Sequence, residues 1–514
     1  MRFDRPEVQY PQQLNCAHEL LDGALARGWG GRVALRSPHL AWTYEQLLEQ
    51  VNRLANVLVS AYGLEPGNRV LLRGPNNPMM AAAWLAVQKA GGICVTTMPL
   101  LRSRELAFTI DKAQVRLGIC DARFCEELDM ARAAAPVLRR IAHFGEDQEL
   151  DRAMRQASPH FDAVPTAADE TSIIAFTSGT TGKAKGTMHF HRDILAICDL
   201  FPVSCLKAGA DDVFCGSPPL AFTFGLGGIL LFPLRIGASA LLLEQATPPH
   251  LIKGIADFRA TVCFTAPTAY RAMLGMLAQH DIGSLRKCVS AGEHLPLATF
   301  EAWRRATGIS IIDGIGSTEM LHIFISADEQ HIRAGSTGRA VPGYDARIVD
   351  EDMRELPRGT VGRLAVRGPT GCRYLDNEER QRAYVKDGWN LPGDSFSMDD
   401  DGYFWYQART DDMIISSGYN IAAAEVENVL LEHPAVQECG VIGVPDEERG
   451  QRIKAYVVLK PGQAGTDALV RELQDYVKAQ IAPYKYPRTI EFVTALPRTE
   501  TGKLQRFRLR EQNA

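Results

Sequence analysis

Helical and strand-like segments alternate along the first 270 residues, and this alternation is the feature that most limits the folds open to the chain. Residues 42–62 place apolar side chains at helical spacing, with Thr43 as the predicted N-cap. An apolar run at 69–73 predicts a strand, and residues 78–90 predict the next helix. Further strands are predicted at 93–95, 117–120, 172–176, 238–243 and 261–265. The alternation favours an α/β fold in which helices flank layered, mainly parallel sheets.

The pattern changes near residue 340, where short alternating strands at 346–349 and 364–367 predict a small β unit. After residue 412 a second α/β pattern begins. Its predicted elements are strands at 413–415, 441–444 and 454–459 and helices at 423–432 and 467–480. We therefore expect a large N-terminal domain of residues 1–408 and a small, mobile C-terminal domain of residues 409–514.

Composition excludes several classes of protein. The chain has 514 residues, and 56 basic minus 61 acidic side chains give a net charge of −5, so it lacks the basic field that binds nucleic acid or an anionic membrane. The charged N-terminus does not look like a signal peptide, and the most apolar stretch, 218–233, is shorter than the ~20 residues of a membrane helix. The eleven cysteines show no CxxC or zinc-ligand spacing. A cytoplasmic location is expected.

The strongest functional signal is the segment TSGTTGKAKG at 177–186, directly after the apolar strand at 172–176. Glycines let the backbone approach a ligand, and the many N–H, hydroxyl and ammonium groups suit a polyphosphate. The spacing differs from the Walker pattern, because only two residues separate Gly179 from Gly182 and Ala184 follows the first lysine. An isolated loop rich in glycine and threonine is typical of many protein surfaces. Ten residues of this composition directly after a buried strand favour a phosphate site instead.

Three further segments carry chemical groups that bind nucleotides in other proteins. In DGIGSTE, residues 313–319, the glutamate could hold Mg²⁺ through hard oxygen ligands. Asp394, in PGD, and Arg409, fifteen residues later, could grip a ribose diol. The segment PRTETGK at 497–503 presents a single lysine. Each segment alone is also typical of ordinary structural loops. Only their order along the chain indicates a function.

In that order the segments resemble the adenylate-forming superfamily of acyl-CoA synthetases, carrier-loading adenylation domains and firefly-type luciferases. The resemblance runs from about residue 15 to residue 508, with these markers: TSGTTGKAKG (177–186), SAGEHLP (290–296), DGIGSTE (313–319), PGD (392–394), ARTDDMI (408–414) and PRTETGK (497–503). It implies an enzyme in which a carboxylate attacks the α-phosphate of ATP, giving an acyl-adenylate and pyrophosphate. A thiol, usually that of coenzyme A, then displaces AMP.

The resemblance also implies roles for individual residues in binding ATP. The phosphate loop would contribute Thr177, Ser178, Gly179, Thr180, Thr181, Gly182 and Lys185. The adenine site would be lined by Gly292, Glu293, His294 and Ile315, with Asp313 accepting from the adenine amine. Thr318 would contact the α-phosphate, Glu319 would bind Mg²⁺, and Asp394 and Arg409 would bind the ribose.

The C-terminal domain would complete catalysis. Lys503 would bridge the attacking carboxylate and the α-phosphate, Asp411 would be the hinge, and the coenzyme A tunnel would be lined by Ser417, Gly418 and Tyr419. Three positions depart from the commonest family pattern: Ala184 replaces a proline, Ala408 replaces a glycine, and Ile315 stands where an aromatic residue often stacks on adenine. No charged catalytic group is missing.

Segments 217–228 and 314–324 look more specifically like the aryl-CoA ligases of benzoate and 2-aminobenzoate catabolism. Two phenylalanines among glycines predict a flat apolar slot for an aromatic acid, although they are also typical of the core of a Gly-rich turn. The predicted acid-binding residues are Phe190, Phe222, Thr223, Phe224, Ala266, Ala291, Gly314, Gly316 and His322. Thr223 or His322 could accept from a ring amino group, so 2-aminobenzoate is the preferred acid and benzoate or another substituted benzoate the alternative.

Two other functions stay open. The chain ends at Ala514, eleven residues after Lys503, with no fused carrier domain, which favours free coenzyme A over a separate carrier protein as the thiol. An inactive acyl- or nucleotide-binding regulator would be expected to have lost Lys503, Glu319 or Asp394, and all three are present. The expected partners are therefore an aromatic acid, ATP with Mg²⁺, and coenzyme A. The sequence leaves the oligomeric state open, with a homodimer as one option.

Overall fold

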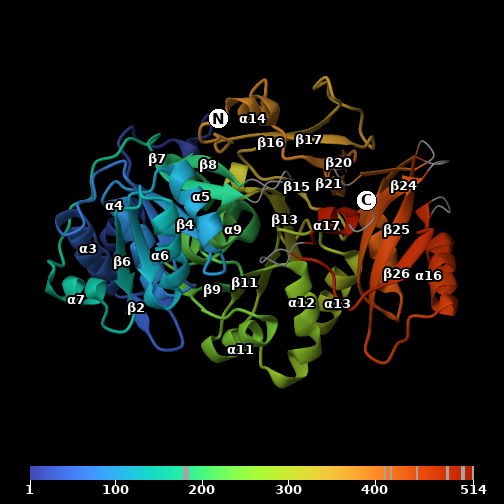
Figure 1. The fold of residues 1–514 in the computed structure, drawn as a ribbon, viewed down its shortest axis with the longest axis horizontal. Coiled ribbons are helices and arrows are strands. Elements are labelled where there is room, and N and C mark those ends of the chain that lie inside the picture. Colours follow the sequence, from blue (N-terminus) through green and yellow to red (C-terminus); the bar gives the residue numbers. More distant parts are fainter. Residues whose placement is uncertain are drawn as a thin grey trace.

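The computed structural model describes residues 1–177, 184–409, 413–416, 419–446, 450–481, 485–498 and 504–511. Within these residues the strands form four sheets. Two large sheets and their helices occupy the left and centre of Figure 1, a third lies above the centre, and the fourth lies at the right. The helices of eight or more residues are α3 (Tyr44–Ser60), α4 (Pro78–Lys89), α5 (Ser103–Ala113), α6 (Cys125–Ala134), α7 (Glu149–Gln156), α8 (His191–Phe201), α11 (Pro248–Phe258), α13 (Leu297–Thr307), α15 (Ala423–Glu432) and α16 (Asp467–Gln480).

The first sheet has the strand order β6-β5-β3-β4-β7-β8 and is parallel except for β8. Its strands are β3 (Arg69–Arg73), β4 (Ile93–Thr97), β5 (Leu117–Asp121), β6 (Arg140–Phe144), β7 (Thr171–Thr177) and β8 (Lys185–Phe190). Both faces are covered: Leu71 packs with α5 and α6, whereas its neighbours Val70 and Leu72 belong to the core shared with α3 and α4. A parallel sheet with buried faces explains its continuous apolar strands.

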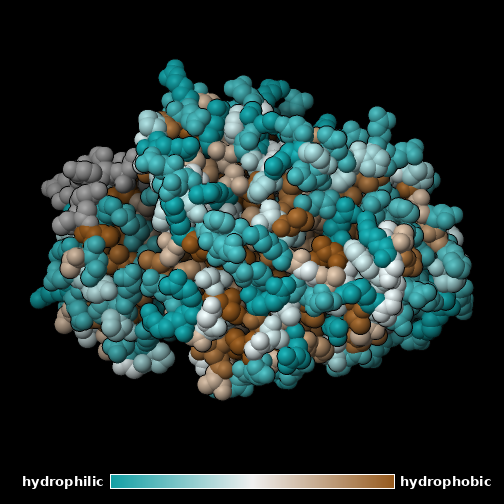
Figure 2. Space-filling view, turned by 180° about the vertical axis from the view of Figure 1, so that it is seen from behind, coloured by the Kyte–Doolittle hydropathy of each residue, from teal (hydrophilic) through white to brown (hydrophobic). Residues whose placement is uncertain are grey.

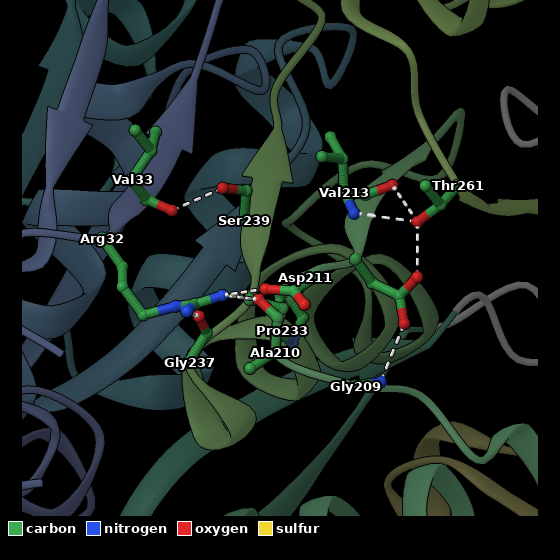
Figure 3. A network of polar contacts seen from close by, with 12 residues as sticks. Arg32, Val33, Gly209, Ala210, Asp211, Val213, Pro233, Gly237, Ser239 and Thr261 are labelled. Carbon is green, nitrogen blue, oxygen red and sulfur yellow. Dashed lines mark hydrogen bonds and ion pairs between the residues drawn. The ribbon is translucent and has the colours of Figure 1, made fainter. Parts of the chain in front are cut away.

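The second sheet has the order β15-β14-β13-β12-β11-β9-β10-β1-β2. Its strands are β1 (Val33–Arg36), β2 (Ala41–Thr43), β9 (Val213–Gly216), β10 (Ser239–Leu241), β11 (Val262–Thr265), β12 (Lys287–Ser290), β13 (Ile311–Gly316), β14 (Ile323–Ser326) and β15 (Arg339–Ala340). Strands far apart in sequence are tied together by side chains, as Figure 3 shows. Arg32 donates to the Gly237 carbonyl at 2.8 Å and to Asp211 at 2.7 Å, and Thr261 accepts from the Val213 amide at 2.9 Å.

The third and fourth sheets are smaller. The third contains β16 (Asp345–Val349), β17 (Gly362–Arg367), β18 (Val385–Lys386), β19 (Trp389–Asn390), β20 (Asp394–Met398) and β21 (Phe404–Arg409). The fourth contains β22 (Met413–Ser416), β23 (Tyr419–Ala422), β24 (Val436–Asp446), β25 (Gly450–Leu459) and β26 (Thr489–Phe492). It is packed against α15 and α16 around its own apolar cluster.

The shorter helical segments connect these layers. They are α1 (Cys16–Leu20), α2 (Asp22–Ala26), α9 (Thr223–Gly225), α10 (Phe232–Ile236), α12 (Pro267–Met273), α14 (Glu378–Tyr384), α17 (Arg506–Glu511), the π-helices η3 (Pro202–Leu206) and η4 (Leu226–Leu231), and the 3₁₀ segments η1 (Pro6–Val8), η2 (Ala122–Phe124), η5 (Leu274–Gln279) and η6 (Thr318–Met320).

The predicted α/β class is confirmed, and several predicted elements agree closely. Thr43 caps α3 by accepting from the Gln46 amide at 3.2 Å, while Gln46 accepts from the Thr43 amide at 2.9 Å, which completes a capping box. The predicted strand at 69–73 matches β3. The sequence did not predict β8, which turns back antiparallel to β7, because its short segment lacks an apolar run.

The face seen in Figure 2 is mostly hydrophilic, with apolar residues in separate patches. Among the described residues, none of the helices combines the length and the apolar character needed to cross a membrane.

Candidate active site

The predicted phosphate loop lies between two paired strands. Thr177 ends β7 and Lys185 begins β8, and the two residues face each other in the antiparallel register. The intervening loop is therefore anchored at both ends to the first sheet. Its residues Ser178, Gly179, Thr180, Thr181 and Gly182 lie outside the described residues.

Glu319 lies near Lys185, the first residue of β8, and is held by a tyrosine that the sequence did not single out. Tyr374 donates its hydroxyl hydrogen to Glu319 Oε1 at 2.8 Å. Tyr374 is placed by a bridge to Thr187 on β8, and the following amide, of Leu375, donates to the Gly186 carbonyl at 2.9 Å. Glu319 Oε2 accepts no hydrogen bond from another described residue, so one carboxylate oxygen is fixed and the other is available.

Two cations lie next to Glu319. The pKa of the Lys185 ammonium is lowered, first by burial and then by the nearby Arg380 guanidinium, while Glu319 raises it. Arg380 lies on α14, and its Nε is buried with no hydrogen-bond partner among the described residues. Like charges held together beside a Gly-rich loop are the arrangement expected where an anion binds.

Thr318 begins η6, the short turn after β13. Its carbonyl accepts from His189 Nε2 at 2.7 Å, and His189 is buried on β8. Asp193 lies 3.6 Å from His189 Nδ1. This contact joins the DGIGSTE segment of the second sheet to the first sheet, so the loops that carry Lys185 and Glu319 share one support.

Asp313 lies on β13, and its Oδ1 is buried without a hydrogen-bond partner in the described part of the chain. Burial raises the pKa of its carboxyl group to about 8. Leu295, Arg333 and Thr337 line the same small hollow as Asp313. An unpartnered buried acceptor of this kind is a place where a donor from a ligand would be stabilised. Ile315, two residues further along β13, is half-buried.

Asp394 and Arg409 are brought together by strand pairing. Asp394 begins β20, Arg409 ends β21, and the two are register partners across the antiparallel pair. Asp394 is 7% exposed. Residues fifteen apart in sequence therefore lie side by side in the backbone, as a shared ribose site would require.

Glu293 and His294 contact the C-terminal part of the chain. Arg498 Nη1 lies 3.3 Å from Glu293 Oε1, and Asn428 Nδ2 lies 3.2 Å from His294 Nε2. The His294 ring also stacks on Tyr406, with centroids 5.2 Å apart. Burial lowers the pKa of His294 to about 4, and Arg506 adds to this shift. Both side chains thus lie at the junction with the C-terminal sheet, which the sequence did not predict.

The predicted acid site contains a cluster of rings around His322. Four phenylalanines lie with ring centroids 4.6–6.4 Å from the imidazole: Phe201, Phe224, Phe232 and Phe264. His322 is 3% exposed, and neither ring nitrogen has a hydrogen-bond partner among the described residues. Burial lowers its pKa to about 3, and the backbone of Phe224 offsets this only in part, without a hydrogen bond of normal geometry. The imidazole is therefore neutral and can accept a hydrogen bond.

Glycines allow the close packing around this ring. A Cβ on Gly227 would lie 2.5 Å from His322 Cδ2, and one on Gly316 would lie 2.6 Å from the His322 carbonyl oxygen. Gly316 is exposed and Phe224 is half-buried, so the cluster has an accessible side next to the end of β13. The Gly-rich segment that the sequence singled out thus forms α9 and the π-helix η4 against His322.

The other predicted acid-binding residues are distributed around this cluster or apart from it. Thr223 and Ala291 are buried, Gly314 packs against Ile323, and Phe222 and Ala266 are half-buried N-caps of α9 and α12. Phe190 differs: Arg192 and Arg373 each lie 5.8 Å from its ring centroid. Its ring therefore packs against two guanidinium groups.

The predicted hinge, tunnel and lysine positions cannot be placed in the same way. Asp411, Ser417, Gly418 and Lys503 lie outside the described residues, as do the side chains of Arg409 and Tyr419. Their flanking elements, β21, β22 and β23, are described above.

Comparison with known proteins identifies the family of the chain. The family model for AMP-binding enzymes matches residues 24–373, and that for the AMP-binding enzyme C-terminal domain matches residues 425–503. The chain belongs to the AMP-binding enzyme family, in keeping with the superfamily expected from its motifs.

The most similar proteins include aryl-acid ligases. The chain is 35% identical to a benzoate–CoA ligase of Thauera aromatica, over 98% of this chain and 97% of the relative. The structure of the anthranilate CoA ligase AuaEII in complex with anthranoyl-AMP matches with a TM-score of 0.95 and 35% identity, over 99% of each chain. A benzoate CoA ligase from Burkholderia xenovorans LB400 matches with a TM-score of 0.89 and 33% identity, over 96% of this chain and 99% of that one. The expected likeness to aryl-CoA ligases is confirmed.

Proposed function

We propose that this chain is an AMP-forming ligase that joins an aromatic acid to coenzyme A, and that the acid is 2-aminobenzoate. The observation that carries the choice of acid is His322, a neutral imidazole among phenylalanine rings, whose two nitrogens have no hydrogen-bond partner in the described part of the chain. A flat ring would pack against the apolar wall, and its ortho-amino group would donate to the imidazole. The ligand of the AuaEII structure, anthranoyl-AMP, is in keeping with this assignment.

An unpartnered acceptor in an apolar site discriminates between acids. Burying a polar nitrogen without a partner costs free energy, and a substrate that supplies a donor recovers it. Benzoate would leave the imidazole unpartnered, whereas 2-aminobenzoate would not. Benzoate is therefore expected to be a weaker substrate in the same slot.

We assign the ATP half of the site to the motif residues. Asp313 accepts from the adenine amine through Oδ1, which has no hydrogen-bond partner among the described residues. Its register partner Ser290 comes just before the segment of Gly292, Glu293 and His294. Asp394 and Arg409 bind the ribose hydroxyls, which their register pairing supports. The phosphates lie along residues 177–185, with Thr318 at the α-phosphate and Arg380 adding a second cation beside Lys185.

Glu319 is the residue that would hold Mg²⁺. Its Oε2 is available, and carboxylate oxygen is a ligand that Mg²⁺ prefers. The bound ion supplies charge neutralisation at the phosphate oxygens. Tyr374 keeps the carboxylate facing the loop by its hydrogen bond to Oε1.

In the first half-reaction the acid carboxylate attacks the α-phosphorus and pyrophosphate leaves. Lys503 is assigned to the attacking oxygen and the α-phosphate, because two anions approach each other only when their charge is neutralised. In the second half-reaction the coenzyme A thiolate attacks the acyl carbon and AMP leaves. We place Ser417, Gly418 and Tyr419 along the thiol path.

The proposal includes a mobile C-terminal domain that turns about Asp411, with its boundary after residue 408. Movement would let Lys503 leave once the adenylate has formed. The third sheet ends at β21 and the fourth begins at β22, which supports a boundary at this point. A cytoplasmic location and a homodimer stay predictions.

The test is coenzyme A-dependent AMP release with ATP, Mg²⁺ and a panel of acids: 2-aminobenzoate, benzoate, 2-hydroxybenzoate, phenylacetate and octanoate. The proposal predicts that 2-aminobenzoate has the highest kcat/KM. Turnover of octanoate alone would contradict an aryl slot. Pyrophosphate exchange with an aryl acid but no AMP release with coenzyme A would indicate a carrier protein as the thiol.

A further inference from the structure

A cysteine, an aspartate and a histidine, all residue types that bind metals, cluster where a helix covers the first sheet. None of the three belongs to the candidate active site. Cys125 and Asp129 come from α6, and His143 comes from the edge strand β6. One ligand atom of each residue lies within 4.8 Å of those of the other two. This site was not predicted from the sequence, because the three residues do not follow a zinc-ligand spacing.

The local fold explains why the three side chains converge. Cys125 and Asp129 are four residues apart, so they lie one above the other on the same face of the helix. His143 is two residues after Ile141 and therefore shares its face of the strand. Ile141 packs in the same apolar cluster as Leu128 of α6, which places the His143 ring beneath that helix.

Glu149 orients the imidazole. Its Oε1 accepts from the His143 amide at 2.9 Å and lies 3.0 Å from Nδ1 of the ring. A carboxylate at this nitrogen keeps the proton on Nδ1 and leaves a lone pair on Nε2. Nε2 is buried and has no hydrogen-bond partner among the described residues. Histidines that bind metals are characteristically held by a carboxylate in this way.

We propose that Cys125, Asp129 and His143 form a Zn²⁺ site, with Glu149 holding the histidine and water in the fourth position. Sulfur, nitrogen and oxygen ligands together suit Zn²⁺, whereas Mg²⁺ prefers oxygen alone. Zn–ligand bonds of about 2.0–2.3 Å place tetrahedral ligands about 3.5 Å apart, so a small side-chain movement closes the site. The ion ties α6 to the edge strand, and the site does not depend on the proposed function.

Thiol labelling tests this site without measuring activity. Ten of the eleven cysteines are buried and Cys125 is partly exposed, so Cys125 is expected to react first with a thiol reagent such as Ellman's reagent. Zn²⁺ at about ten times its dissociation constant should slow this reaction about elevenfold by simple competition. The same concentration of Mg²⁺ should not slow it.

Three variants test the two proposed ligands Cys125 and His143 and the supporting residue Glu149. Cys125→Ser should lose the fast reaction and also the thiolate-to-metal absorption band expected when Co²⁺ is added to the wild type. His143→Gln should keep the fast reaction but lose protection by Zn²⁺, and Glu149→Gln should weaken the apparent affinity about 10- to 100-fold. His160→Gln, at an exposed histidine, is the matched control and should behave as the wild type.

A single fast-reacting thiol in His143→Gln, with the ten buried cysteines still protected, shows that this variant is folded. If Zn²⁺ does not slow labelling of the wild type, the proposal is wrong. It is equally wrong if Zn²⁺ protects His143→Gln as well as the wild type, because the thiol alone would then bind the metal.

Discussion

His294 and His322 are two histidines whose pKa values are lowered by burial, to about 4 and about 3, yet their surroundings differ. His294 contacts Asn428 and stacks on Tyr406, so its environment is shared between the N-terminal and C-terminal parts of the chain. His322 lies among four phenylalanine rings, all of which belong to the N-terminal part of the chain. Under the proposed function, conformational control and acid selection would therefore lie in separate regions of the chain.

The largest effect is expected from Lys503→Ala. Removing the cation that we propose neutralises the adenylation transition state should slow pyrophosphate release about 100- to 1,000-fold. Thioester formation from supplied 2-aminobenzoyl-adenylate and coenzyme A should change little. The two half-reactions are measured separately by rapid quench. Equal loss in both would show that the C-terminal region does not act in one half-reaction at a time.

The second prediction concerns pH and the ring cluster around His322. Its folded-state pKa lies below the value of about 6.5 in the unfolded chain, so this contribution to stability is complete above pH 6.5 and falls as the pH drops. By pH 5 the loss is about 2 kcal/mol. In His322→Phe, the difference in free energy of unfolding between pH 7 and pH 5 should shrink by about this amount, measured by urea denaturation. An unchanged difference would mean that His322 is protonated in the folded protein.

The third prediction concerns Arg498→Ala, which removes a contact between the C-terminal part of the chain and the region of His294. Arg498 joins Glu293 at 3.3 Å and Glu438 at 2.8 Å, which ties the segment before Lys503 to the N-terminal domain. Its loss should slow adenylation about fivefold, or about 1 kcal/mol, without changing the preference between acids. Lys460→Ala, at an exposed lysine of the same domain, is the control. A changed acid preference would mean that the two regions are coupled.

The smallest effect is expected from Tyr374→Phe, which removes the hydroxyl bound to Glu319 and keeps the ring. Free rotation of the carboxylate should raise the Mg²⁺ concentration for half-maximal adenylation about threefold, with a smaller change in kcat. A magnesium titration at saturating ATP checks this. A fall in kcat with no change in the magnesium requirement would contradict a positioning role for Tyr374.

The parts of the fold that could be predicted from the sequence are those determined by residues close together in the chain. The Thr43 cap, strand β3 and helix α16 follow from propensity and spacing within a few residues, and the structure confirms them. The return strand β8 was missed because its position depends on pairing with β7. The sheet order likewise depends on contacts across the chain, such as that between β1 and β10.

The candidate site divides in the same way. Motif order pointed to Glu319 and to the pair of Asp394 and Arg409, which are register partners. The partner of Glu319 could not be found from spacing, since Tyr374 is 55 residues away. The contact of Arg498 with Glu293 spans 205 residues and exists only once both domains are folded. The phenylalanine rings around His322 also come from several elements. The sequence indicated which residues belong to the candidate site, but the contacts around each of them could be found only from the folded structure.

We propose that His322 selects the acid by accepting from an ortho-amino group. The measurement that tests this selection is the ratio of kcat/KM for 2-aminobenzoate to that for benzoate, in the wild type and in His322→Phe. The substitution is expected to lower this ratio roughly 5- to 150-fold, or about 1–3 kcal/mol, because benzoate makes no use of the imidazole. An unchanged ratio, with both acids affected equally, would contradict it.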